Sequence, residues 1–309
     1  MASESLPWLP MEMNLETLNA CPICGTEHIR TIDAVSNICE CEPCGYVFDN
    51  PRPTIEELVA FYSQPAKYDS WLSEEQARDQ LWKRRLKQVL SVTKPGSLLD
   101  VGAGIGQFLD LARPHFSSVS GTEVSESAIQ IARKKYGLEL MRGEIHTVDF
   151  GTTQFDNITV FHVLEHVPNP RLVIERCERL LPTGGVLVIA VPNDVQSLRA
   201  RTKRFLRTVG VPKFRKTGRL GLPKLVLDGS LSEIHLSHFT PVALKRLVEK
   251  LGFSVVWNTL DPYFAASGTG KWKQGGYYEC CRALNFFLRT NFYDTILLVA
   301  RKGISQAAS

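Results

Sequence analysis

The chain has 309 residues, of which 44% are hydrophobic and 22% are charged, and its formal net charge is +4. These values are typical of a globular protein with one large core, and they argue against a disordered or fibrous chain. No apolar run reaches the roughly 20 residues that cross a bilayer. The N-terminus lacks the basic start and apolar core of a secretory signal, so a cytoplasmic protein is expected.

Two copies of one cysteine pattern lie near the N-terminus, CPICG at 21–25 and CEPCG at 41–45. Two such turns can bring four thiolates to the corners of a tetrahedron, the geometry of structural zinc. The expected ligands of one Zn²⁺ are Cys21, Cys24, Cys41 and Cys44. Cys39 is less suitable because the two-residue spacer is missing there. A zinc ribbon over residues 1–50 is predicted, with a metal that supports folding rather than chemistry.

Residues 51–94 are predicted to form a helical linker or lid. Thr54 suits the N-cap position of a short helix that starts with IEEL. A longer charged helix is expected at about 70–92, before the break at Pro95-Gly96.

From residue 97 the chain alternates short apolar strands with amphipathic helices. The seven predicted strands are SLLDVG, SVSGTEV, LELMRG, FDNITVFHVL, VLVIAVPN, FSVVWNTL and TILLVAR. Ser125 and Thr240 suit helix N-caps, and Gly137 suits a helix end. The pattern predicts an α/β, Rossmann-like domain over 95–302, with a seven-stranded, mostly parallel sheet covered by helices on both faces, followed by a tail at 303–309. Ligands of such sheets bind at the carboxyl ends of the strands.

The stretch LLDVGAGIGQFL joins a strand to a helix through Gly102, Gly104 and Gly106. Glycines at such a turn let the backbone approach a nucleotide-like ligand. The spacing departs from the G-x-G-x-x-G of dinucleotide sites, because position 107 is Gln. Asp100 is a poor neighbour for a pyrophosphate and a good one for an ammonium group, which argues against a nicotinamide cofactor.

The next two strands end on residues that suit a nucleoside. Glu123 lies about twenty residues after the first glycine, where a carboxylate can accept hydrogen bonds from ribose hydroxyls. Glu144 and Ile145 follow the third strand and offer one polar and one apolar side chain to an adenine ring.

Four motifs in order, LLDVGAGIGQFL, GTEVSESAIQIAR, FDNITVFHVLEHVPNPRLVIERCERLLPTGGVLVIAVPN and HLSHFTPVALKRLVEKLGF, resemble those of class I S-adenosylmethionine-dependent methyltransferases. The resemblance covers 97 to about 302, in the subgroup with the ubiquinone-biosynthesis O-methyltransferases, and the front end is similar to members with a zinc ribbon. It implies S-adenosylmethionine as cofactor. The implied contacts are the methionine end for Asp100, Gly102 and Gly104, the ribose for Glu123, adenine for Glu144 and Ile145, and the sulfonium for His162.

Methylation of a hydroxyl needs a group that removes its proton, and histidine suits this task. His235 and His238, in EIHLSHF, are the first candidates because their segment is expected to overhang the pocket. His166 is the third candidate. A metal-assisted variant with Glu165 and a histidine is not supported by the spacing.

A basic insertion, 199–230, is expected to form a substrate lid. Residues 199–224 hold ten basic residues and no acidic one, which leaves 26 basic against 32 acidic residues elsewhere. The segment suits an anionic acceptor, RNA or a membrane surface, and a solvated lid is the alternative. The glycine-rich ASGTGKWKQGG at 266–276 is predicted to be a mobile loop.

These observations favour a methyltransferase that acts on a small molecule, with O-methylation of a glycan, lipid or secondary-metabolite precursor as the leading hypothesis. The alternatives are an RNA methyltransferase and an inactive S-adenosylmethionine-binding relative. HVLEH replaces the Asn/Asp-Pro-Pro-aromatic motif of enzymes that methylate base nitrogens, which argues against RNA. The acceptor, the methylated atom and the oligomeric state stay open at this level.

Overall fold

The computed structural model describes most of the chain. The described residues are 14–62, 75–93, 95–214, 218–222, 225, 233–266, 268–289 and 291–303. Within these ranges no helix combines the length and the apolar character that a membrane crossing requires.

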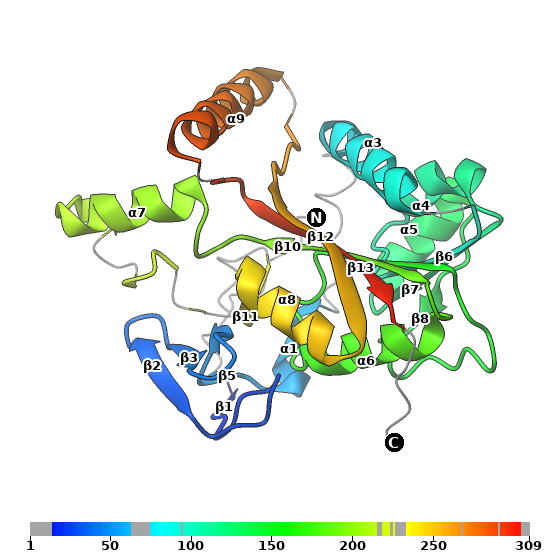
Figure 1. Ribbon diagram of the computed structural model, residues 1–309, viewed down its shortest axis with the longest axis horizontal. Coiled ribbons are helices and arrows are strands. Elements are labelled where there is room, and N and C mark those ends of the chain that lie inside the picture. The colour runs from blue at the N-terminus through cyan, green and yellow to red at the C-terminus, as the bar shows by residue number, and fades with distance from the viewer. Residues whose placement is uncertain are drawn as a thin grey trace, which may run out of the picture.

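A seven-stranded sheet forms the centre, in the order β12-β13-β10-β9-β6-β7-β8 (Figure 1). Its strands are β6 (Ser97–Val101), β7 (Ser118–Glu123), β8 (Met141–Arg142), β9 (Asn157–Phe161), β10 (Val186–Pro192), β12 (Phe253–Asp261) and β13 (Thr295–Lys302). The five strands from β10 to β8 pair in parallel, whereas β13 is antiparallel to both of its neighbours. This arrangement confirms the predicted fold class.

Helices surround this sheet (Figure 1). They are α1 (Ile55–Tyr62), α3 (Glu75–Val92), α4 (Gln107–Ala112), α5 (Glu126–Tyr136), α6 (Pro170–Leu180), α7 (Leu198–Thr208), α8 (Pro241–Lys250) and α9 (Gly268–Leu288), with short 3₁₀ turns at Arg113–His115 and Pro212–Phe214. Some of the helices cover the two faces of the sheet, whereas α7 and α9 extend away from it (Figure 1). Apolar side chains of α3, α4 and α5 share one cluster with the sheet, and those of α6 and α8 share the other. Ser125 and Thr240 cap α5 and α8, and Gly137 ends α5, as predicted.

The N-terminal residues form a small sheet that is completed by a strand from a much later part of the chain. Strands β2 (Ile29–Asp33), β3 (Ile38–Cys41) and β4 (Val47–Asp49) pair in sequence, and β11 (Ser237–His238) joins the edge of β4. A separate pair joins β1 (Leu15–Glu16) to β5 (Arg52–Pro53). This sheet therefore crosses the boundary that the sequence places at residue 50.

The glycine-rich segment at 266–276 differs from its prediction. The predicted mobile loop at 266–276 is wrong from Gly268 onward, because α9 begins there. Each glycine costs about 1 kcal/mol in a helix, but the tertiary contacts of the next turns offset this cost. Tyr278 is buried, and its hydroxyl donates a hydrogen bond to Asp294 at 3.0 Å.

The basic insertion begins with α7, and parts of it, 215–217, 223–224 and 226–230, lie outside the described residues.

Candidate functional site

One cavity of about 940 Å³ opens at the carboxyl ends of the central parallel strands. The glycine turn after β6 and the end of β7 line one part of it, and the loops after β9 and β10 line another. The segment 233–238 and helices α1, α3 and α7 contribute further walls. The position agrees with the expectation for ligand sites in α/β sheets.

The glycine turn has the backbone conformation that its sequence predicts. Gly102 has a φ of +68°, and a Cβ added there would lie 2.5 Å from Cγ2 of Val163. Gly104 and Gly106 also have positive φ values, and Gly106 immediately precedes α4. The turn therefore requires glycine for both conformation and space, and it presents bare backbone to the cavity.

Asp100 and Glu123 lie beside this turn, and both are buried. Oδ1 of Asp100 accepts a hydrogen bond from Oγ1 of Thr159 at 2.6 Å, and burial raises the pKa of Asp100 to about 7. Oε2 of Glu123 accepts from the amide of Gly104 at 2.8 Å, and burial raises its pKa as well. A cationic ligand would favour the charged form of both carboxyls.

The predicted adenine contacts line the same cavity. Glu144 and Ile145 follow β8, and Ile145 is almost fully buried. Oε2 of Glu144 lies 3.2 Å from Nε2 of His146. The residues on either side of Glu144 in the cavity wall, Gly143 and Ile145, are apolar. Seven of the eight predicted cofactor residues thus line this cavity, and the eighth, Gly106, lies in the same glycine turn.

His162 occupies the end of β9 with a positive φ of 57°. A guanidinium nitrogen of Arg85 donates to its Nε2 at 3.3 Å, and its Nδ1 lies 3.2 Å from Oε1 of Glu165. Arginine only donates, so Nε2 must accept and Nδ1 must carry the proton. Burial lowers the pKa of His162, so the ring is neutral and its single lone pair is already used.

His166 and His235 face each other across the other part of the cavity, with ring centroids 5.0 Å apart. Nδ1 of His166 donates to the carbonyl of Ile234 at 2.6 Å, which leaves its Nε2 without a proton in the neutral ring. Nδ1 of His235 lies 2.9 Å from Oδ2 of Asp194. Burial disfavours the charged ring of His235, but the hydrogen bonds to Asp194 and Glu233 outweigh it and hold its pKa well above 6.5.

Glu165 lies beneath these two rings and is 1% exposed. Its Oε2 has no hydrogen-bond partner among the described residues. Donor atoms of Glu165, His166 and His235 lie within 4.8 Å of one another, a spacing that also fits a cation. The three side chains therefore lie close together, and Oε2 of Glu165 can still accept a hydrogen bond.

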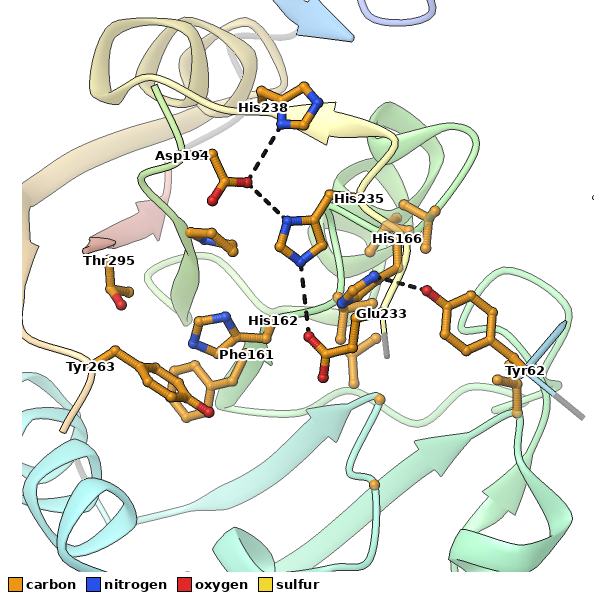
Figure 2. Close-up of a pocket in the computed structure, with 18 of the residues that line it drawn as sticks. Tyr62, Phe161, His162, His166, Asp194, Glu233, His235, His238, Tyr263 and Thr295 are labelled. Atoms are coloured by element: carbon orange, nitrogen blue, oxygen red, sulfur yellow. Dashed lines mark hydrogen bonds and ion pairs between the residues drawn. The ribbon is translucent and has the colours of Figure 1, made fainter. Parts of the chain in front are cut away.

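Like His235, whose Nδ1 faces Asp194 and whose Nε2 lies 3.9 Å from Oε2 of Glu233, His238 has an acidic partner at each ring nitrogen. Its Nε2 lies 2.9 Å from Oδ2 of Asp49. Its Nδ1 lies 3.5 Å from Oδ2 of Asp194, a contact that Figure 2 shows. Burial opposes its charge, but the two carboxylates raise the pKa of His238 to about 9. The ring is an imidazolium at neutral pH, and neither nitrogen offers a lone pair to a substrate.

Several residues of this cluster were not singled out from the sequence. Asp194 follows β10 directly, so its place at the carboxyl end of a predicted strand was an available signal. Asp49, Tyr62 and Glu233 gave no such signal, because they come from the ribbon, a short helix and a loop. The hydroxyl of Tyr62 lies 3.0 Å from Nδ1 of His166 (Figure 2).

The four predicted zinc ligands lie close together in the N-terminal part of the chain. Their sulfur atoms lie within 4.8 Å of one another, with Cys21 and Cys44 at 3.7 Å and Cys24 and Cys41 at 3.5 Å. Four ligands at the usual Zn–S distance of about 2.3 Å in a tetrahedron place neighbouring sulfurs about 3.8 Å apart. The donor set fits a structural zinc ion.

Comparisons with known proteins find methyltransferases. A demethylmenaquinone methyltransferase of Thermotoga maritima is 27% identical over 196 residues, which cover 62% of this chain and 83% of that protein. A ubiquinone biosynthesis O-methyltransferase of Coxiella burnetii is 32% identical over 116 residues, which cover 35% of this chain and only half, 50%, of that protein. A solved SAM-dependent methyltransferase of T. maritima shares the fold, with a TM-score of 0.50 at 18% identity over 79% of this chain and 99% of that one.

The sequence pattern of the family described as "Methyltransferase domain" matches residues 73–257, which is more than half of the chain. The matched part contains the glycine turn, Glu123 and the histidine cluster. The protein therefore belongs to the methyltransferase-domain family of S-adenosylmethionine-dependent methyltransferases.

Proposed function

We propose that this protein transfers a methyl group from S-adenosylmethionine to an oxygen atom of a small-molecule acceptor. The observation that carries the proposal is the shared cavity, whose one part is the glycine turn and whose other part holds His166 and His235. Nε2 of His235 lies 3.9 Å from Oε2 of Glu233, beyond hydrogen-bond distance, so its neutral ring can accept a proton there. When bound, S-adenosylmethionine supplies a methyl group that its sulfonium makes electrophilic. The protein has to orient the acceptor, exclude water and take up one proton.

The residues around the glycine turn suit the cofactor. Glu123 would accept hydrogen bonds from the ribose, and Glu144 and Ile145 would border adenine. Asp100 and the turn glycines would hold the methionine end. Because burial, with the negative charge of Glu123, raises the pKa of Asp100 to about 7, a neighbouring ammonium or sulfonium would restore its negative charge. His162 would border the sulfonium as a neutral ring, which suits a position beside a cation.

His235 is the proposed general base. As the neutral acceptor hydroxyl attacks, its proton passes to Nε2 of His235, and Asp194 at Nδ1 stabilises the imidazolium that forms. His166 borders the same part of the cavity, and its unprotonated Nε2 is the alternative acceptor for that proton. His238, with both nitrogens bound to carboxylates, is assigned to positioning rather than to proton transfer.

An anionic acceptor is favoured by the cationic residues at the α7 side of the cavity. Arg199 and Lys203 line it, and no acidic residue occurs in α7. Arg199 lies 3.6 Å from Asp294, so one of its partners is already a carboxylate. A carboxylate or phosphate on the acceptor would extend this pairing.

The function is tested in two steps. Calorimetry with S-adenosylhomocysteine should show binding at one site per chain, and NADH should not bind. Radiolabelled S-adenosylmethionine should then label a compound in a small-molecule extract of the native host. Label in total RNA would instead support an RNA methyltransferase, and tight cofactor binding without label in either fraction would indicate an inactive relative.

We also propose that the ribbon binds one structural zinc ion through Cys21, Cys24, Cys41 and Cys44. Metal analysis of the purified protein should give one equivalent of zinc per chain, which Cys24→Ser should remove. A second equivalent that survives Cys24→Ser would place a cation at Glu165, His166 and His235 and would displace the proton-acceptor role given to that cluster.

A further inference from the structure

A row of alternating acidic and basic groups runs from the ribbon to the base. Asp49 at the end of β4 contacts His238. His238 in turn contacts Asp194, and Asp194 contacts His235 (Figure 2). Asp49 and His238 are both nearly inaccessible to water. The row links residues separated by 189 positions in the sequence, so it exists only because the ribbon and the methyltransferase sheet pack together.

The backbone fixes the geometry of this row. β11 pairs with β4 so that Ser237 faces Phe48 and His238 faces Val47. The amide of Asp49 donates to the carbonyl of Leu236 at 3.0 Å, and the amide of Leu236 donates to the carbonyl of Glu165 at 2.7 Å. The segment that carries both histidines is therefore held between the ribbon on one side and the loop after β9 on the other.

We propose that Asp49 of the ribbon is a positioning residue for methyl transfer, which acts on the base His235 through His238 and Asp194. This role rests on the proposed function, in which His235 removes the acceptor proton. The ribbon then belongs to the machinery of the active site and is more than a folding module.

Electrostatics gives Asp49 a specific task. With both ring nitrogens protonated, His238 donates to two carboxylates at once, and its positive charge offsets part of the charge of Asp194. Asp194 then attracts the proton of His235 less strongly than an unshared carboxylate would. The other titratable groups that face His235 are Glu233, Glu165 and His166. Asp49 itself faces His238, Asp194 and His235; burial, with the negative charge of Asp194, raises its pKa against the attraction of the two histidines.

Asp49→Asn separates this charge effect from geometry. The asparagine amide can donate to Nε2 of a neutral His238, whose Nδ1–H still donates to Asp194, so the row of hydrogen bonds survives without the charge. A neutral His238 no longer offsets part of the negative charge of Asp194, so Asp194 raises the pKa of His235 further. The acidic limb of the pH profile, in which kcat rises with pH, should therefore move to higher pH by roughly one unit. The plateau value of kcat at high pH should not change.

Asp49→Ala removes the hydrogen bond as well as the charge. His238 loses its anchor, so the plateau of kcat should fall about 10–100-fold, because small misplacements of catalytic groups cost up to about that factor. Binding of S-adenosylhomocysteine should stay within about twofold. Asp33→Asn is the matched control: Asp33 is a buried ribbon acid whose partners are backbone amides, including that of Leu220 at 3.1 Å, and its pH limb should stay in place.

A readout without acceptor keeps this test independent of the proposed function. Histidine ring resonances of the protein saturated with S-adenosylhomocysteine are titrated by NMR, and Asp49→Asn should lower the pKa of His238 and raise that of His235. Unchanged ring titrations in Asp49→Asn would overturn the link even if the protein methylates a small molecule. Shifted titrations in a protein that methylates nothing would uphold the link and reject the proposed function.

Discussion

The two ends of the cavity are built in different ways. Most of the proposed cofactor end comes from one continuous stretch, 98–145, to which β9 and the residue after it add Thr159 and His162. The acceptor end combines residues from β4, α1, the loops after β9 and β10, and the segment before β11. Local structure therefore specifies most of the proposed cofactor site, whereas long-range packing builds the proposed acceptor site.

The largest expected effect tests the acceptor end. His235→Ala should lower kcat with the true acceptor by about 10²–10⁴-fold, the usual contribution of a general base. Calorimetry should give an unchanged affinity for S-adenosylhomocysteine, since His235 lies outside the cofactor stretch. A loss of only a few-fold would move the base elsewhere, with His166→Ala as the next variant to measure.

The corresponding change at the cofactor end should affect binding instead. Glu123→Ala removes a carboxylate placed to accept hydrogen bonds from the ribose, and hydrogen bonds to charged groups contribute about 1.5–3 kcal/mol each. The affinity for S-adenosylhomocysteine should fall about 10–100-fold by calorimetry. Glu126→Ala, in the exposed first turn of α5, is the control and should bind normally. Equal affinities of the two variants would show that Glu123 does not touch the cofactor.

The pH dependence should come from the acceptor end. Only the neutral ring of His235 accepts a proton, and Asp194 and Glu233 raise its pKa well above 6.5. Below that pKa, kcat should rise about tenfold for each pH unit. Asp194→Asn removes the nearest anion, so the limb should move to lower pH by about one unit or more. A rate that falls as pH rises from 6 to 9 would contradict this assignment.

The smallest expected effect concerns Tyr62, which joins α1 to His166. Tyr62→Phe removes a hydroxyl that lies 3.0 Å from Nδ1 of His166 and donates to the carbonyl of Ile234 at 3.1 Å. One such hydrogen bond contributes about 0.5–1.5 kcal/mol, so kcat should fall about 2–10-fold. Steady-state kinetics should show this loss with an unchanged KM for S-adenosylmethionine.

The same contrast explains how far the sequence could predict the structure. Strand-turn-helix patterns and caps such as Ser125 and Thr240 depend on near neighbours, so the sheet and the cofactor end followed from local rules. The partners of His235 and His238 depend on which loops meet, and no local pattern encodes the pairing of β4 with β11. The helix at 268–288 was missed because glycines at its start signal a loop, while contacts with Asp294 decide otherwise.

The strand that the ribbon borrows has a consequence for the order in which this protein is made. Val47 and Phe48 leave the ribosome long before Ser237 and His238, the residues that pair with them. Between Asp49 and His238 lie 189 positions, which take about 10–40 s to synthesise at bacterial and eukaryotic elongation rates. For that interval the edge of β4 lacks its native neighbour, so the nascent N-terminal segment is the part of the chain that most needs protection from other strands.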